Sequence, residues 1–291
     1  MEQPEPERTW RQRVGDYQSW LAERARVERE RHTSVDVTLE AIDRDSNVAG
    51  GLMAGALAYR LFIWLLPFAL TLVGVLGITA DARGESPRDT AAEAGLTGLV
   101  TSSVADAAKG SGRWYAVAIG LPVLVWTTRS LLRTLIAVHR LVWADRRERV
   151  GKATWAGAGR LLLALLVLYF LGPVIDRVWP IEGDVVVFVL VEAALYSLVW
   201  LLVTLRLPHG GTDWRALLPG AVLFALGGMV LATLIYYVIG PYASSREDTY
   251  GALGLATALL LGLFLIARLV VASAVLNATL WARRARKDGR T

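Results

Sequence analysis

Six ionisable side chains lie within long apolar stretches of this sequence, where a charge is energetically costly. They are Arg60, Arg129, Arg133, Arg160, Glu192 and Arg268. In the stretch "AGALAYRLFIWLLPFALTLVGVLG", residues 54–77, Arg60 is the only charged side chain. A charge near the centre of a bilayer helix costs about 2.5–3.5 kcal/mol on insertion scales, and such residues normally face other helices or a water-filled cavity. These six residues are therefore the first candidates for a functional site.

Three of these side chains are expected to lie deep in the membrane. With a rise of about 1.5 Å per residue, Arg60, Arg268 and Glu192 lie about 12, 18 and 20 Å from the predicted inner boundary. The similar depths of Arg268 and Glu192 predict an ion pair between them, with Arg60 and its neighbour Tyr59 close by. Two interpretations remain open, a salt bridge that holds the helix register or a polar cavity that a molecule passes through. Five of the six charges are cations, which favours an anionic ligand.

Four arginines are expected near the inner membrane surface. Arg129 and Arg133 are one helical turn apart, and Arg140 continues the same face. Arg160 lies within two turns of the inner end of the third apolar stretch. Long side chains so placed can extend to the phosphate level. They predict either general anchoring to headgroups or a specific site for an anionic headgroup, so the expected partners are anionic membrane lipids and no nucleic acid.

No residue pattern in the chain indicates catalysis. The three histidines, His32, His139 and His209, lie in separate segments without the spacing of a metal site. The chain has no cysteine and no glycine-rich phosphate loop. The sequence "DRD" at Asp43–Asp45 lacks the glycine and the distal glutamate of a calcium loop. We therefore expect no catalytic residue, no metal and no cofactor, and we predict that the protein is not an enzyme.

The elements that carry these residues are apolar blocks of about 20 residues or more, separated by short polar segments. A helix needs about 20 apolar residues to cross the hydrocarbon core. Helices rather than strands are expected, because no two-residue alternation appears. The predicted spans are residues 49–78, 114–138, 154–175, 184–205, 214–241 and 250–281. The predicted fold is all-α, a polytopic membrane domain of six transmembrane helices over residues 49–281.

The distribution of basic residues predicts the orientation of these spans. With both termini on the cytoplasmic side, the inner segments hold 20 lysines and arginines and the outer segments hold 6. Basic residues favour the cytoplasmic side of a membrane protein. We therefore predict a multi-pass protein of the inner (plasma) membrane with both termini in the cytoplasm.

Segments outside the spans are predicted to be partly helical. Residues 1–48 form a predicted cytoplasmic segment of amphipathic helices. Its apolar positions at helical spacing are Trp10, Val14, Tyr17 and Leu21, followed in a second short helix by Val35, Leu39 and Ile42. A further short helix is predicted in the first outer loop, from the spacing of Leu96, Leu99 or Val100, and Val104. Residues 282–291 form a basic cytoplasmic tail.

Small residues and prolines recur within the spans. Gly51 and Gly55 have the small-xxx-small spacing that is typical of close helix packing, and Gly227 and Gly228 lie in a later span. Prolines at membrane-helix positions can kink a helix or begin it. Those prolines are Pro67, Pro122 and Pro219.

Two stretches of the sequence resemble the YihY/BrkB family of bacterial inner-membrane proteins. The first span carries small residues, then Leu57, Ala58 and Tyr59, and then an apolar run around Pro67. The last span enters with "YGALG" and leaves with "LNA". The family-motif positions are Pro67, Tyr250, Gly251, Gly254 and Asn277. The resemblance covers residues 45–281, and it differs from many relatives at Arg60, where their residue is uncharged.

The resemblance implies a role in envelope integrity. It suggests transport or flipping of a lipid or another anionic envelope component through a polar cavity. A non-catalytic membrane scaffold or envelope-assembly protein, acting through its cytoplasmic face, is the alternative. The older ribonuclease label of the family fits neither the predicted topology nor the missing catalytic residues.

Overall fold

The computed structural model describes residues 17, 33–83, 112–143, 154–178, 185–234, 237 and 252–287. Within these ranges the chain is helical and contains no strand. The helices are α2 (Thr33–Asn47), α3 (Gly50–Arg83), α6 (Gly112–Trp143), α7 (Trp155–Val178), α8 (Val185–Thr204), α9 (Trp214–Leu234) and α11 (Ala252–Lys287).

Six of these helices, all except α2, are long and apolar enough to cross a membrane. This confirms the predicted six helices. Three of them exceed the length that a bilayer requires, because α3, α6 and α11 have 34, 32 and 36 residues. At 1.5 Å per residue they are roughly 48–54 Å long, against about 30 Å of hydrocarbon. Part of each long helix must therefore lie outside the hydrocarbon core.

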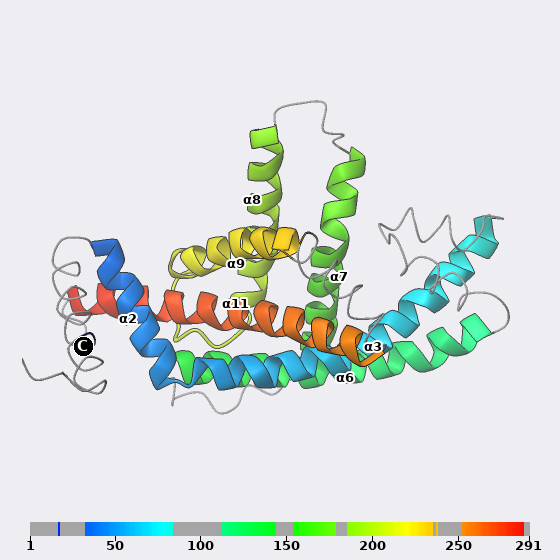
Figure 1. Ribbon diagram of the computed structural model, residues 1–291, viewed down its shortest axis with the longest axis horizontal. Helices are drawn as coiled ribbons and strands as arrows, with labels where there is room; N and C mark the ends of the chain where they lie inside the picture. Colours follow the sequence, from blue (N-terminus) through cyan, green and yellow to red (C-terminus); the bar gives the residue numbers. More distant parts are fainter. Residues whose placement is uncertain are drawn as a thin grey trace, which may run out of the picture.

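The long helices form one layer, and a helical hairpin crosses it. In Figure 1, α3 and α6 run antiparallel, side by side, and α11 runs along them. The shorter α9 packs beside α11, whereas α7 and α8 stand across the direction of the long helices. The short α2 crosses the end of α11 and is followed directly by α3. We refer to this end of the molecule as the α2 end.

Two contacts inside the apolar interface fix the antiparallel register of α3 and α6, one a hydrogen bond and the other a close approach of a glycine. Trp64 Nε1 donates a hydrogen bond of 2.8 Å to Thr128 Oγ1. Further along, Gly120 lies so close to Thr71 that an added Cβ would be 2.7 Å from Thr71 Oγ1. The Thr71 hydroxyl donates to the carbonyl of Pro67, one turn earlier in α3. A buried threonine thus satisfies its hydroxyl within its own helix.

A second close approach joins α9 to α11 through the amide of Asn277. The Gly220 N–H donates to Asn277 Oδ1 at 2.7 Å, and Asn277 Nδ2 donates to the Leu217 carbonyl at 3.1 Å. Gly220 follows Pro219, which lies inside α9 and has no N–H of its own. The side chain of Asn277 therefore binds to the main chain of α9 beside the proline.

The tight glycine contacts are only partly those that the sequence predicted. At Gly51 and Gly55, an added Cβ would meet nothing within 4 Å, so the small-xxx-small spacing does not bring two helices together there. Close approach occurs as predicted at Gly227, where an added Cβ would lie 2.5 Å from Leu269 Cδ1 of α11. It also occurs at Gly120 and Gly220, which the spacing did not indicate. The physical reason is that contact depends on which helix face meets a neighbour, and spacing along one helix does not reveal this.

The buried core lies mainly among α3, α6 and α11, where small and branched residues interdigitate. Its fully buried members include Leu57, Leu131 and Val271. Large apolar side chains also cover the outside of the spans, and Leu190, in α8, is 62% exposed. Such an outer surface suits a helix that meets lipid rather than water.

The predicted second N-terminal helix exists as α2, and its contact with α11 is made by acidic residues. Ile42, one of the apolar positions at helical spacing, is 55% exposed. The face that meets α11 carries Asp36 and Glu40 instead. Of the stripe over residues 10–21, only Tyr17 lies within the described residues, and the predicted helix of the first outer loop lies outside them.

Candidate functional site

Arg268 is paired with a residue of α2 rather than with Glu192. Its Nη1 donates to Asp45 Oδ1 at 2.7 Å and its Nη2 donates to Asp45 Oδ2 at 2.6 Å, a bidentate pair. The predicted Arg268–Glu192 pair is therefore wrong. Counting depth along each helix assumed that all spans begin at one plane. Instead, α11 continues past the start of α3, and Arg268 lies close to α2.

Further ion pairs join α2 to the last turns of α11. Arg283 Nη2 pairs with Asp36, and Arg283 Nε lies 2.9 Å from Glu40 Oε2. Arg286 also pairs with Glu40. These contacts place the acidic face of α2 against the basic end of α11, with the bidentate Arg268 pair at the other end of α2.

Arg44 ties α2 to the end of α6. Its Nη2 donates to the Val142 carbonyl at 2.9 Å and its Nε donates to the same oxygen at 3.3 Å. Burial lowers the pKa of the Arg44 guanidinium, and the neighbouring Glu40 carboxylate opposes this shift. The carbonyl belongs to the last turn of α6, where helix carbonyls have no partner within the helix. One cation therefore caps α6 and fixes α2.

Arg60 and Tyr59 lie on an exposed face of α3. Tyr59 is 57% exposed, and Arg60 also belongs to the exposed side chains. The prediction that Arg60 points into the interior of the bundle is therefore wrong. Arg60 lies one turn before Trp64 in α3, on the side of the α2 end. In the antiparallel α6, Arg133 follows Thr128, the partner of Trp64, and so lies on the same side. Both arginines thus occur in the parts of α3 and α6 next to the α2 end.

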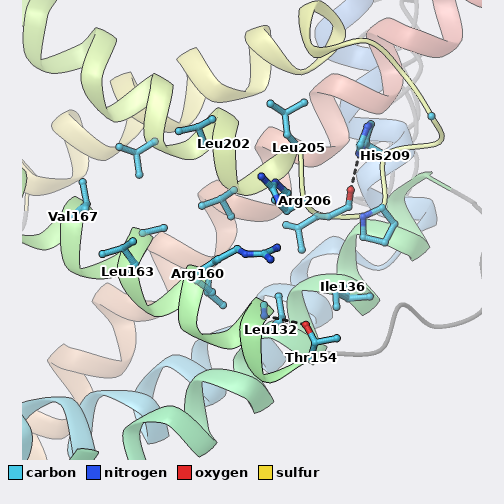
Figure 2. Close-up of a pocket in the computed structure, with 18 residues that line it drawn as sticks. Leu132, Ile136, Thr154, Arg160, Leu163, Val167, Leu202, Leu205, Arg206 and His209 are labelled. Carbon is cyan, nitrogen blue, oxygen red and sulfur yellow. Dashed lines mark hydrogen bonds between the residues drawn. The ribbon is translucent and has the colours of Figure 1, made fainter.

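A cavity of about 710 Å³ opens between α6, α7, α8 and the loop between α8 and α9. Apolar side chains supply most of its wall, among them Leu132 of α6, Leu163 of α7 and Leu202 of α8. Figure 2 shows two cations within it, Arg160 from α7 and Arg206 from the start of the loop. This volume is within the range of pockets that bind small molecules.

Among the described residues, the wall of the cavity carries two cations and no acidic side chain, which makes this part of the cavity electropositive. Arg160 and Arg206 are both exposed to it, and none of the 18 lining residues is Asp or Glu. In Figure 2 the two guanidinium groups end in the same part of the cavity. A planar guanidinium presents several donors to phosphate or carboxylate oxygens. An apolar wall with two such groups suits a molecule that has an anionic head and an apolar body.

Local hydrogen bonds hold the polar rim of this cavity. Thr154 caps the start of α7, where Gly157 N–H donates to Thr154 Oγ1 at 3.0 Å. In the loop, His209 Nδ1 donates to the Leu207 carbonyl at 2.7 Å. Gly210 and Gly211 follow with φ of 64° and 69°, a conformation that favours glycine. The sequence "PHGG" is thus a defined turn that forms one side of the cavity.

The other headgroup candidates lie apart from the cavity wall. Arg129 stacks over the ring of Trp155, with Cζ 4.5 Å from the ring centroid, and Arg133 is exposed on α6. Arg140 is half-buried near the end of α6. Glu192 is half-buried in α8. Of these four residues, none lines the cavity, so the structure brings only Arg160 into it from the predicted set.

Three of the five family-motif positions lie within the described residues. Pro67 lies inside α3, and its carbonyl accepts the Thr71 hydroxyl. Asn277 is buried and binds the main chain of α9. Gly254 lies in α11, whereas Tyr250 and Gly251 lie outside the described residues.

Sequence reasoning missed Arg206 and His209 as cavity residues. Arg206 was counted only towards the charge bias, and His209 only as an isolated histidine. A usable signal was present, because Arg206 directly follows an apolar span and Arg160 lies near the start of the preceding one. Consecutive antiparallel helices with one short loop bring such positions together, although the sequence alone does not show that a cavity separates them.

These features define a class, a polytopic α-helical membrane protein with an electropositive cavity near one end of its helices. The family model of virulence factor BrkB matches residues 41–291. The chain therefore belongs to the BrkB family, as its first and last spans predicted. No curated protein and no solved structure matches the chain.

Proposed function

We propose that this protein binds an anionic amphiphile of the cell envelope and moves it across the inner membrane without catalysing a reaction on it. The observation that carries the proposal is the cavity of about 710 Å³ with Arg160 and Arg206 in an apolar wall. The guanidinium groups would hold an anionic headgroup, and the apolar wall between α7 and α8 would accept its hydrocarbon part. Membership of the BrkB family supports a membrane role for the whole chain.

The position of the arginines supports a headgroup site at the inner boundary of the bilayer. In α3, residues 61–80 follow Arg60 without a charge, and these 20 residues span about 30 Å. If this stretch fills the hydrocarbon core, Arg60 lies at its inner edge, and α2 lies in the cytoplasm with the predicted topology. Arg160 directly precedes the uncharged stretch 161–175 of α7. A headgroup bound to Arg160 would then be level with the phosphates of the inner leaflet.

The test is the movement of a labelled anionic lipid in vesicles that contain the purified protein. Fluorescent phosphatidylglycerol in phosphatidylcholine vesicles is bleached by dithionite only in the outer leaflet, which reports exchange between leaflets. The R160Q/R206Q double variant should lower the protein-dependent exchange roughly 10-fold or more, because charge-assisted hydrogen bonds contribute about 1.5–3 kcal/mol each.

Arg215 provides a matched control. It is an exposed arginine at the start of α9, with Cζ 5.4 Å from the Trp214 ring, and it does not line the cavity. R215Q removes the same kind of charge and should leave exchange unchanged. Wild-type exchange in the double variant, or an equal loss in R215Q, would refute the assignment of the cavity as the substrate site.

A further inference from the structure

We propose that the ligand of the cavity is a lipid phosphate monoester, whose doubly charged head lies between Arg160 and Arg206. This inference rests on the proposed function, because it names the chemical class of the molecule that the same cavity takes. Phosphodiester lipids, whose heads carry a further alcohol or amine, are then weaker ligands of this site. The phosphatidylglycerol of the exchange assay is one of these weaker ligands.

Two positive charges in the cavity require two negative charges on a tightly bound ligand. Arg160 and Arg206 are exposed to the cavity, and neither forms an ion pair with any other described residue. When hydrocarbon displaces water from the apolar wall, a guanidinium without a counter-charge costs free energy. A phosphate monoester carries close to two negative charges above neutral pH, whereas a phosphodiester or a carboxylate carries one. Of these heads, the monoester alone neutralises both arginines.

The arrangement of the two guanidinium groups suits a phosphate with three free oxygens. Arg160 comes from α7 and Arg206 follows the end of α8, and the two groups end in the same part of the cavity in Figure 2. A guanidinium donates two parallel hydrogen bonds to two oxygens of a phosphate. The three free oxygens of a monoester let both arginines bind in this way, with one oxygen shared. A phosphodiester has two free oxygens, so both arginines must compete for the same pair.

The described part of the wall has no side chain suited to an amine or a sugar. It contains no Asp, Glu, Asn or Gln, and no Trp, Tyr or Phe. An ammonium head is held by carboxylates or by surrounding aromatic rings, and sugar hydroxyls need acceptors as well as donors. One side-chain acceptor, Thr154 Oγ1, already accepts the Gly157 N–H. The other is Nε2 of neutral His209, because its Nδ1 donates to the Leu207 carbonyl. A head that consists of acceptor oxygens alone fits this wall.

Apolar side chains lead away from the two arginines along both helices of the hairpin. In α7, Leu163 and Val167 follow Arg160 by three and seven residues, a spacing that places them on one helix face. In the antiparallel α8, Leu202 precedes Arg206 by four residues. These three apolar side chains line the cavity and are also exposed. A lipid with its head between the arginines can therefore extend its hydrocarbon along the hairpin and into the bilayer.

The experiment compares three lipids that have the same acyl chains and differ only in the head. Phosphatidic acid is a monoester, phosphatidylmethanol is a diester without a hydroxyl group, and phosphatidylglycerol is a diester that carries hydroxyl groups. Native mass spectrometry of the purified full chain in detergent micelles gives the dissociation constant of each lipid, at about pH 8.5, where the monoester is dianionic. Phosphatidic acid should bind at least about 10-fold more tightly than phosphatidylmethanol, because one further charge-assisted hydrogen bond is worth that factor. Phosphatidylglycerol should bind no more tightly than phosphatidylmethanol.

Arginine variants show whether the preference arises in the cavity. R160Q and R206Q should each remove most of the preference for phosphatidic acid, and the control R215Q should keep it. A preference that survives in both R160Q and R206Q would place the phosphate outside the cavity and overturn the assignment.

The comparison of lipids uses the wild-type chain, so it does not depend on the folding of any variant. Equal binding of phosphatidic acid and phosphatidylmethanol would refute the monoester, and so would tighter binding of phosphatidylglycerol than of phosphatidylmethanol. In either case the proposed function stands if R160Q/R206Q weakens the binding of all three lipids. Binding of all three lipids that is unchanged in R160Q/R206Q would refute the proposed function as well.

Discussion

The contact between α9 and α11 allows a sharp test with two glycines of the same helix. At Gly220, an added Cβ would lie 2.4 Å from both the Ser273 carbonyl oxygen and Asn277 Nδ2. At Gly228, an added Cβ would meet nothing within 4 Å. G220A should therefore destabilise the protein, and G228A should not.

The magnitude follows from the hydrogen bonds that the methyl group displaces. The Ser273 carbonyl belongs to the main chain of α11 and cannot rotate away, so the helices must separate or Asn277 must move. Either movement disrupts the two bonds of Asn277, at 2.7 Å to Gly220 N–H and 3.1 Å to Leu217 O. Two buried bonds at about 1–3 kcal/mol each, less about 1 kcal/mol gained from replacing a helical glycine, give a net loss of roughly 1–5 kcal/mol.

The assay is equilibrium unfolding in mixed dodecylmaltoside and dodecylsulfate micelles, followed by circular dichroism. G220A should unfold at a lower dodecylsulfate fraction than the wild type, and G228A at an equal or higher one. N277A removes the amide, and in the double variant with G220A the two losses should not add, because both act on the same contact. A G220A protein that is as stable as G228A would refute the role assigned to this contact.

Two further predictions concern polar contacts at the start of α3 and near its middle. An added Cβ at Gly50 would lie 2.0 Å from Asp45 Oδ1 and must displace the carboxylate from Arg268. G50A should therefore lower the free energy of unfolding by about 1 kcal/mol. This value allows for the 38% exposure of the Arg268 side chain, which weakens the ion pair. The control G51A meets nothing within 4 Å, so equal stability of the two variants in the same unfolding titration would contradict this. W64F removes the 2.8 Å hydrogen bond to Thr128 and should cost about 1 kcal/mol, because the Thr128 hydroxyl still donates to its own helix; an unchanged unfolding midpoint would count against it.

The helices themselves were predictable from the sequence because membrane insertion depends on a local property. An uncharged run such as residues 61–80 is long enough to cross hydrocarbon whatever the rest of the chain does. The predicted spans therefore agree with the helices, apart from their ends. The C-terminal ends of α3, α6 and α11 extend further, because a helix can continue into water once its amphipathic face is covered, as α11 does beside α2.

The partners of the charged residues were not predictable in the same way. Arg268 and Asp45 are 223 positions apart, and no local pattern connects them. The wrong choice of Glu192 came from equating equal depth with contact, although depth says nothing about which helices are neighbours. The cavity was missed for a related reason. Arg160 and Arg206 each look like a helix-end cation, and their meeting depends on how α7 and α8 cross the layer of long helices.

The proline-containing bend of α3 has a mechanical consequence. Beyond the contact of Thr71 with Gly120, the C-terminal part of α3 turns away from α6 in Figure 1. Pro67 lies just before this point and breaks the regular ladder of main-chain hydrogen bonds. The 13 residues from Thr71 to Arg83 form a rigid segment about 18 Å long, so a pivot of about 10° moves its far end by about 3 Å. A small change in packing at the Thr71–Gly120 contact thus produces a larger displacement of the C-terminal end of α3, at the opposite membrane face.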